Sequence, residues 1–498
     1  MVEGTPQATA WQQHAEQRNS QPGREPGRKP GVRRFLAAAQ VRVALLFPAA
    51  PASPAPVETG SLVKTTLAQT AFVCVGAILL LLRVAHIPAW DSIYAEDNGV
   101  FLVGALAHPW HLLESYGGYE QLGPRLIGQL IASFVPLVYA SDAYAAAGAL
   151  ITSACGLLLY HASEGYIRSR WLRAMLGAAL VLLPLAPLEI IDSGVNSPWY
   201  TLTALFFAIL WRPKSWPGQL AAALIAFSAA SSEVTAFFYA PLLIMRLVAL
   251  PRWREQAVTA GWVAGLLMQV PVVLASYTSG APRLRMSNLS TAGQVIAFYF
   301  HNVVLRALGW KLSLHLIQVA GYNGATVIVG AVLAAGITWA MVVGGPPVRF
   351  FAVVALLTGF VETALSATIT AYVNGQVPTW SFLPAARYST VPVVLIDAIL
   401  IVGVDAYLRR HGPVRLPRAR APRARFWSRS LVALTVLACL LGFGWLTDFR
   451  YASQRTYEGY WRVEAQQWLH ECGRSQTGEI SVQAWYSKAT IECSRLRR

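Results

Sequence analysis

Apolar runs alternate with short polar segments along most of the chain. Each run is about 17 to 25 residues long, which is enough for a helix to cross the apolar core of a bilayer. Because a helix satisfies its own backbone hydrogen bonds, it is the form that such a run takes in lipid. The pattern therefore predicts an all-α integral membrane protein with about 11 to 13 transmembrane helices.

The apolar runs place the predicted spans. The first covers roughly residues 66–86, and the others lie near 125–140, 143–160, 172–190, 197–211, 217–231, 234–250, 256–276, 322–344, 350–372, 387–408 and 430–447. The segment 277–320 is more polar and predicts a second outer loop with a half-buried helix near 294–310. These are twelve spans, whereas a cytoplasmic N-terminus with an external tail requires an odd number of crossings. Either 294–310 also crosses, or one short segment between 125 and 250 is re-entrant.

The two ends of the chain differ from the apolar region between them. Residues 1–64 are rich in Pro, Gly, Gln, Arg and Ala and predict a disordered, basic cytoplasmic extension. Residues 65–447 form the predicted transmembrane domain, and 448–498 form a small extracytoplasmic tail. The tail contains Cys472 and Cys493, which predict a disulfide on the oxidising side of the membrane, with reduced thiols as the alternative.

Composition and charge exclude two classes of function. The chain is 55% hydrophobic and only 13% charged, which argues against a soluble enzyme. Its net charge of +16 does not indicate a nucleic-acid partner, because the basic residues cluster between apolar runs as the positive-inside bias requires. The densest cluster, residues 409–429 with eight arginines, predicts a cytoplasmic anchor that contacts anionic lipid. We therefore expect a multi-pass protein of the plasma (inner) membrane.

The loop after the first span carries the candidate chemistry. Asp91, Glu96 and Asp97 lie within seven residues of one another, in a chain with 24 acidic residues in total. A short helix from Gly99 to Ala107 is expected to lie along the membrane interface after them. Such a concentration of carboxylates at the predicted outer face favours a reactive centre, and a plain solvated loop is the alternative.

Sugar transfer to a hydroxyl would use these residue types. A carboxylate base accepts the proton of the acceptor, and arginine is well suited to hold a phosphate leaving group. Glu96 and Asp97 supply the acids, while Arg125 and Arg387 each stand at the start of a predicted span. For both arginines the alternative is an extended side chain that reaches the lipid headgroups.

Several short motifs resemble a known family. The segments E-D-N-G-V-F-L (96–102), Y-G-G-Y-E-Q-L-G-P-R-L-I (116–127), N-S-P-W-Y (196–200) and A-R-Y (386–388) are similar to those of bacterial polytopic glycosyltransferases of the GT-C type. The resemblance covers roughly residues 85 to 400, with one departure at residues 120 and 121, where Glu-Gln replaces a Gly-Tyr-Leu-type step.

That resemblance implies a fold and a reaction. The fold is a GT-C-like bundle with interfacial helices in the first outer loop, and the donor is a sugar linked to polyprenyl phosphate. Asp97, or Glu96 as the alternate, would act as base or metal ligand, and Arg125 and Arg387 would hold the lipid phosphate. The implied substrate-binding residues are Asp91, Tyr119, Arg125, Asn196, Arg387 and Tyr388. A divalent cation on the two acids is an open alternative, and the sugar, the acceptor and the oligomeric state are not specified.

Five further acids fall in or beside the apolar runs and support a different class of function. They are Glu189, Asp192, Glu233, Glu362 and Asp397. An ionisable group in lipid is costly, so each is expected to face the interior of the bundle or a wet cavity. A proton path through Glu362 and Asp397 would indicate a secondary transporter or a flippase of lipid-linked or small polar substrates. A membrane scaffold without activity is the third alternative.

Overall fold

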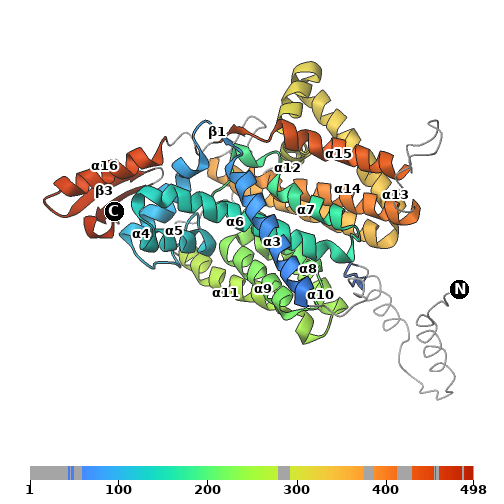
Figure 1. Cartoon of the computed structure of the whole chain (residues 1–498), viewed down its shortest axis with the longest axis horizontal. Helices are drawn as coiled ribbons and strands as arrows, with labels where there is room; N and C mark the ends of the chain where they lie inside the picture. Colours follow the sequence, from blue (N-terminus) through green and yellow to red (C-terminus); the bar gives the residue numbers. More distant parts are fainter. Residues whose placement is uncertain are drawn as a thin grey trace, which may run out of the picture. The chain divides into compact units, whose positions relative to one another are not determined.

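The computed structural model describes residues 43–44, 46–49, 59–278, 292–374, 386–411, 429–453, 455, 459–484 and 487–496. Residues 1–42 of the predicted extension lie outside these ranges, as do residues 279–291 of the predicted polar segment 277–320 and residues 412–428 of the arginine-rich cluster. The described part of the chain is mainly helical (Figure 1). Leu46 and Phe47 are buried in the main core, so ordered structure begins before the predicted boundary at residue 65.

The helices follow the predicted apolar runs closely. In chain order they are α3 (Thr59–Leu81), α4 (Val103–Ala107), α5 (Leu122–Phe134), α6 (Ala140–Ala162), α7 (Arg170–Val181), α8 (Ser197–Leu210), α9 (Trp216–Ser232), α10 (Ala240–Ala249), α11 (Ala257–Thr278), α12 (Ala292–Tyr299), α13 (Trp310–Asn374), α14 (Thr390–His411), α15 (Arg429–Thr447) and α16 (Trp461–Arg474). The short helix expected at residues 99–107 is present as the π-helical segment η2 (Asp97–Leu102) followed by α4.

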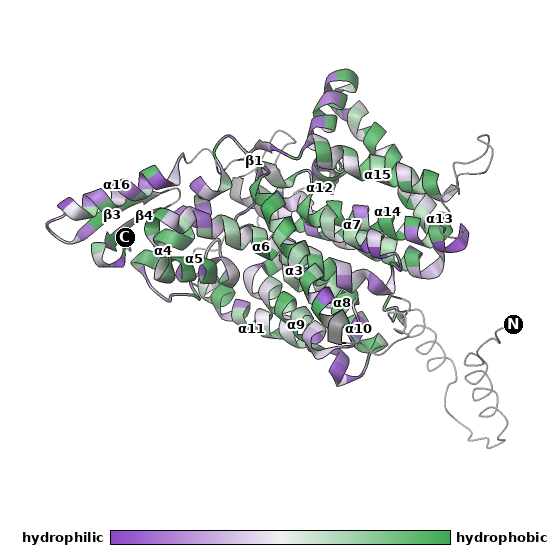
Figure 2. Cartoon of the chain, viewed as in Figure 1, coloured by the Kyte–Doolittle hydropathy of each residue, from purple (hydrophilic) through white to green (hydrophobic). Residues whose placement is uncertain are grey.

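Six of the described helices are long and apolar enough to cross a membrane. They are α3, α6, α11, α13, α14 and α15. Their outer surfaces carry exposed large apolar side chains such as Leu67, Leu267 and Leu357. Figure 2 shows hydrophobic residues along these helices and hydrophilic residues concentrated in connections and in the tail. Because soluble proteins rarely expose so much apolar surface, the chain is a helical membrane protein.

Other predicted spans form helices that are too short to cross a bilayer alone. α5, α7 and α8 contain 13, 12 and 14 residues, which corresponds to roughly 18 to 21 Å against an apolar thickness of about 30 Å. Every residue of α8 is buried, so this helix lies inside the bundle. The total of 11 to 13 spans therefore remains a prediction, because apolar periodicity does not separate a short buried helix from a spanning one.

Two glycines divide the 65-residue element α13. Gly321 has φ 68° and ψ 173°, and Gly345 has φ 71° and ψ −172°. A backbone with positive φ suits glycine because it has no Cβ atom. The second break is followed directly by Pro346 and Pro347. The two breaks coincide with the start and the end of the predicted span at 322–344.

Helices α6 and α14 connect two chemically different ends of the bundle. The loop end contains residues 89–98, 114–121 and 186–196 together with Arg387, and Ser141 at the start of α6 donates to the carbonyl of Trp90 there. The basic end contains Gly165–Arg173, Arg252–Glu255 and the end of α14 at Arg409–His411. With 23 residues in α6, the two ends are separated by about 35 Å.

The tail forms a small unit against the loop end. Strands β3 (Glu479–Ala484) and β4 (Ser487–Glu492) pair antiparallel beside α16. Cys472 and Cys493 are joined by a disulfide, which confirms the predicted pairing. Apolar residues of the tail form a second core with residues of η2, α4, α5 and α6. At the start of the tail, β2 (Tyr451–Ala452) pairs in parallel with β1 (Val84–Ala85).

Candidate functional site

A buried arginine near the end of the chain holds the loop after α3 in place. Arg455 donates to the carbonyls of Ala89, Ser92, Ile191 and Asp192, and its Nε also donates to the hydroxyl of Ser92. Its side chain is 1% exposed. The guanidinium thereby joins two segments that are about a hundred residues apart in the sequence. This arrangement places the acids at 96 and 97 directly above the loop between α7 and α8.

Asp97 is fully engaged by that second loop. Its Oδ2 accepts hydrogen bonds from the Ser193 hydroxyl at 2.8 Å and the Gly194 amide at 2.9 Å, and its Oδ1 accepts from the Val195 amide at 2.7 Å. Burial raises the pKa of Asp97 to about 6, although these three hydrogen bonds oppose the shift. A side chain at position 194 would crowd the carboxylate, since a Cβ atom there would lie 3.0 Å from Oδ1. Asp97 is therefore a structural link between the loops.

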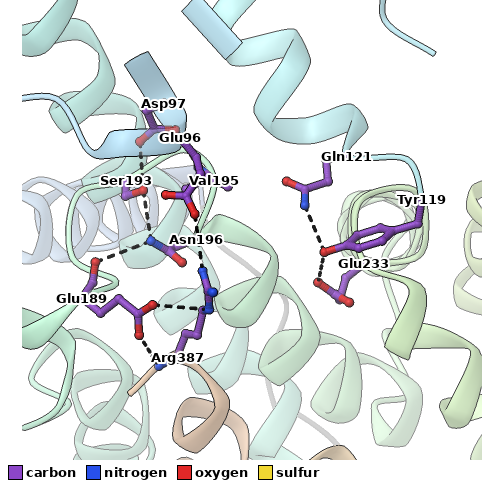
Figure 3. Close-up of polar contacts among 10 residues, drawn as sticks. All are labelled: Glu96, Asp97, Tyr119, Gln121, Glu189, Ser193, Val195, Asn196, Glu233 and Arg387. Atoms are coloured by element: carbon purple, nitrogen blue, oxygen red, sulfur yellow. Dashed lines mark hydrogen bonds and ion pairs between the residues drawn. The ribbon is translucent and has the colours of Figure 1, made fainter. Parts of the chain in front are cut away.

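Glu96 faces a different group, which we call the acid–arginine cluster and which consists of Glu96, Glu189 and Arg387. Figure 3 shows the Arg387 guanidinium between the two carboxylates. Its Nε lies 3.3 Å from Glu189 Oε1, its backbone amide donates to Glu189 Oε2 at 2.9 Å, and its Nη1 lies 3.9 Å from Glu96 Oε1. Glu189 is completely buried, whereas 24% of the Arg387 side chain is exposed. The arginine is thus firmly anchored on one side and only weakly held on the other.

The position of Glu189 differs from the sequence prediction, which included it in the span at 172–190. α7 ends at Val181, so Glu189 and Asp192 belong to the loop between α7 and α8. The prediction extended the span too far because residues 182–191 are largely apolar. Burial raises the pKa of Glu189 to about 7, and the positive charge of Arg387 acts against this shift. Burial likewise raises the pKa of Asp192 to about 7.

Aromatic and amide groups complete the surroundings of Arg387. The guanidinium lies 5.2 Å from the ring centroid of Tyr388, and that ring meets Trp199 edge to face at 5.4 Å. Asn196 precedes α8 and donates to the Ser193 hydroxyl at 3.2 Å. The predicted residues Asn196, Arg387 and Tyr388 therefore gather around the same loop as Asp97.

A second set of polar residues lies on the other side of the view in Figure 3. Tyr119 donates to Glu233 Oε2 at 3.4 Å and accepts from the Gln121 amide at 3.0 Å. Glu233 lies between α9 and the 3-10 segment η6 (Val234–Tyr239), and its Oε1 accepts from the Thr235 amide at 3.4 Å. The Thr235 hydroxyl donates to Glu362 at 2.6 Å. A chain of hydrogen bonds thus runs from Tyr119 into α13.

Arg125 belongs to a third set of contacts. Its Nη1 pairs with Glu114 at 3.2 Å, and its Nε lies 3.9 Å from the buried Glu120. The guanidinium also lies 5.8 Å from the ring centroid of Phe101. Two carboxylates therefore surround Arg125, and neither belongs to the acid–arginine cluster. The expectation that Arg125 and Arg387 act as a pair receives no support from these contacts.

Asp91 contacts the tail. Its Oδ1 accepts from the backbone amide of Arg462 at 3.1 Å, at the start of α16. Nearby, Asn98 donates to Glu464 at 3.3 Å. These two contacts attach the tail to both ends of the acidic loop, which gives Asp91 an evident structural role.

The described residues contain no group of three or more His, Cys, Asp or Glu side chains arranged to hold a metal ion. Glu96 and Asp97 point to different partners, since Asp97 faces N–H and O–H donors while Glu96 faces Arg387. The rings of His108 and His111 stack with centroids 5.7 Å apart. The geometry therefore does not favour the divalent cation that was open from the sequence.

Two contributors to the site, Glu189 and Arg455, were not among the predicted site residues. Glu189 had a signal in the sequence, as an acid inside an otherwise apolar stretch. Arg455 also had one, because it follows the last span on the predicted outer side, against the positive-inside bias. Neither signal identifies a partner, which only the fold provides. Comparisons of the chain with known protein families, curated proteins and solved structures find no match.

Proposed function

We propose that the protein is a membrane glycosyltransferase that moves a sugar from a polyprenyl-phosphate donor to a hydroxyl acceptor at the outer face of the membrane. The observation that carries the proposal is the acid–arginine cluster. It combines a phosphate-binding side chain with a nearby carboxylate, in a helical membrane protein and at the end of helices rather than within them.

Arg387 is the proposed phosphate ligand. Its bonds to Glu189 hold the backbone and one edge of the guanidinium in place. The 3.9 Å contact with Glu96 is the weakest in the cluster, and the side chain is partly exposed. The singly charged phosphodiester of the donor could therefore displace Glu96 and pair with Arg387, because arginine forms strong, charge-assisted hydrogen bonds with phosphate oxygens.

Glu96 is the proposed base, in preference to Asp97. The carboxylate of Asp97 already accepts three hydrogen bonds and is 1% exposed, whereas Glu96 is 8% exposed and has Arg387 as its charged partner. Phosphate binding to Arg387 would free Glu96 next to the bond that breaks. Asp97 would then act indirectly, by holding the acidic loop against the loop between α7 and α8.

The proposed reaction is a single displacement. The acceptor oxygen attacks the anomeric carbon while its proton passes to Glu96. A new carbon–oxygen bond forms, and the bond from the anomeric carbon to the phosphate oxygen breaks. Polyprenyl phosphate leaves with the electron pair of that bond, and Arg387 stabilises its negative charge.

Binding of a polyprenyl phosphate to the purified protein tests the proposal. A ligand that binds the folded state raises the unfolding temperature. We expect this increase for the wild type and for Arg125→Gln, whose arginine pairs with other acids, but not for Arg387→Gln. The absence of an increase in the wild type, or an equal increase in Arg387→Gln, would contradict the proposal. The unfolding temperature of each variant without ligand shows whether the variant is folded.

The hydrogen-bonded chain from Tyr119 to Glu362 favours a second candidate, a secondary transporter or flippase. It reaches from the loop end into α13, and Thr235 lies between two buried carboxylates. Acids connected through a hydroxyl are the kind of arrangement that carries protons in transporters. Under this alternative, Glu362→Gln would abolish substrate movement in vesicles while Glu96→Gln would have little effect.

A further inference from the structure

A cavity of about 400 Å³ opens at the basic end of the bundle, far from the candidate site. Segments from four parts of the chain line it, including Pro48, Gly165, Val348 and the end of α14. This volume falls in the range of pockets that bind small molecules or headgroups. We call it the basic pocket.

Three arginines line the basic pocket: Arg168, Arg409 and Arg410. Arg409 pairs with Asp405 at 3.2 Å, and Asp405 also accepts the backbone amides of Arg168 and Ser169. Asp405 is 2% exposed and is not among the residues that line the pocket. Within the described ranges, the guanidinium groups of Arg168 and Arg410 form no ion pair with a carboxylate. The pocket thus presents more positive than negative charge.

The pocket lies where lipid headgroups are expected. One candidate span ends at Gly165, which lines the pocket, and another ends at His411, next to Arg410. The end of an apolar spanning helix marks the boundary between hydrocarbon and headgroups. Arginines at this boundary can reach lipid phosphates, and basic pockets between spanning helices are suited to anionic headgroups.

We propose that the basic pocket binds the phosphate of an anionic phospholipid headgroup through Arg168, Arg409 and Arg410. This site is separate from the proposed donor site, because Arg387 lies just before the start of α14, whereas Arg409 and Arg410 lie at its end. Binding would stabilise the packing of the connection between α6 and α7 against the end of α14. The proposal does not depend on the proposed sugar transfer.

The test uses the full-length protein in nanodiscs of phosphatidylcholine with or without phosphatidylglycerol. Arg168→Gln/Arg410→Gln removes two exposed arginines of the pocket and keeps the Arg409–Asp405 pair. Arg252→Gln/Arg254→Gln removes two exposed arginines from another connection at the same end and is the matched control. We expect phosphatidylglycerol to raise the unfolding temperature of the wild type and the control, and the pocket variant to lose most of this increase.

A second measurement counts the lipids that remain bound when the protein is released from the nanodisc for native mass spectrometry. We expect the pocket variant to retain one phosphatidylglycerol fewer than the control. Equal behaviour of the two variants in both measurements would overturn the proposal. Stabilisation in detergent by inorganic phosphate, as large as that by phosphatidylglycerol, would assign the pocket to a soluble anion and would also overturn it.

Discussion

The loop end and the basic end of the bundle are joined by the same helix, α14, but their charged side chains lie in different environments. At the loop end Glu189 is completely buried and depends on Arg387 for its counter-charge. At the basic end Arg168 and Arg410 are exposed, and a buried acid, Asp405, has its charge balanced by Arg409. The exposed arginines at the basic end stay in contact with water and can pair with lipid headgroups. At the loop end burial also raises the pKa of Glu189 to about 7, and a strongly shifted carboxyl beside a partly exposed arginine is typical of a functional site.

The largest expected effect is the loss of Arg387. Arg387→Ala leaves the buried carboxylate of Glu189 unpaired, which is expected to reduce the free energy of unfolding by about 3 kcal/mol. Chemical unfolding of the purified protein in detergent measures this change. Arg387→Ala/Glu189→Gln should recover part of the loss, because a neutral amide needs no counter-charge. A double variant that is less stable than the single variant would contradict the account.

Removal of the tail disulfide is expected to reduce stability almost as much, but only within the tail. Cys472 and Cys493 are 21 residues apart, and a closed loop of this length stabilises by about 3 kcal/mol in the loop-entropy model. Cys472→Ser/Cys493→Ser should therefore increase hydrogen exchange in β3 and β4. Exchange in α14 should stay unchanged, because that helix lies in the other core. Faster exchange across the whole bundle would show that the tail is not a separate unit.

The adjacent acids Glu96 and Asp97 are expected to differ in how much their substitution reduces stability, although both effects are smaller than those above. Asp97→Asn places an amide N–H₂ group among three donors, and we expect a loss of about 2 kcal/mol in the free energy of unfolding. Glu96→Gln loses only a 3.9 Å contact with Arg387 and should change stability much less. Thermal unfolding of the two isosteric variants compares them directly. A greater loss of stability in Glu96→Gln would reverse the roles assigned to the two residues.

A separate effect is expected in the dependence of stability on pH. Burial raises the pKa of Asp192 from 3.8 to about 7 in the folded protein, so the folded state binds its proton more tightly than the unfolded state. The stability associated with this proton is complete below pH about 4 and is lost as the pH rises towards 7. Asp192→Asn should flatten the decline in unfolding temperature between pH 4 and 7. An unchanged slope would show that other groups cause the decline. Asparagine also tolerates the φ of 53° found at this position.

The contrast between the two ends also shows what the sequence could predict. Apolar periodicity located most of the helices and the bounds of the span at 322–344, which coincide with the breaks at Gly321 and Gly345, because each of these is a local property of the chain. The disulfide was predictable because the tail has only two cysteines. Periodicity could not predict which helices are too short to span, since a buried helix and a spanning helix are both apolar.

Partners that are distant in sequence were the main missing information. Glu96 and Asp97 are neighbours, yet one contacts Arg387 and the other contacts the loop at Ser193, because successive residues of a helical turn point in different directions. Arg125 and Arg387 looked equivalent from their positions at the start of a span. In the structure Arg125 pairs with Glu114, an exposed residue that no sequence motif marks as a partner.

The most direct test of the central claim is sugar transfer in proteoliposomes. They would contain wild-type protein, Glu96→Gln or Asp97→Asn, and they would be supplied with radiolabelled hexose and pentose donors on polyprenyl phosphate. We predict transfer by the wild type and a decrease of about 10²-fold or more in Glu96→Gln, the usual contribution of a general base. Glu96→Gln should keep the unfolding temperature and the polyprenyl phosphate binding of the wild type. Full activity of Glu96→Gln, or no transfer by the wild type from any of these donors, would contradict the account.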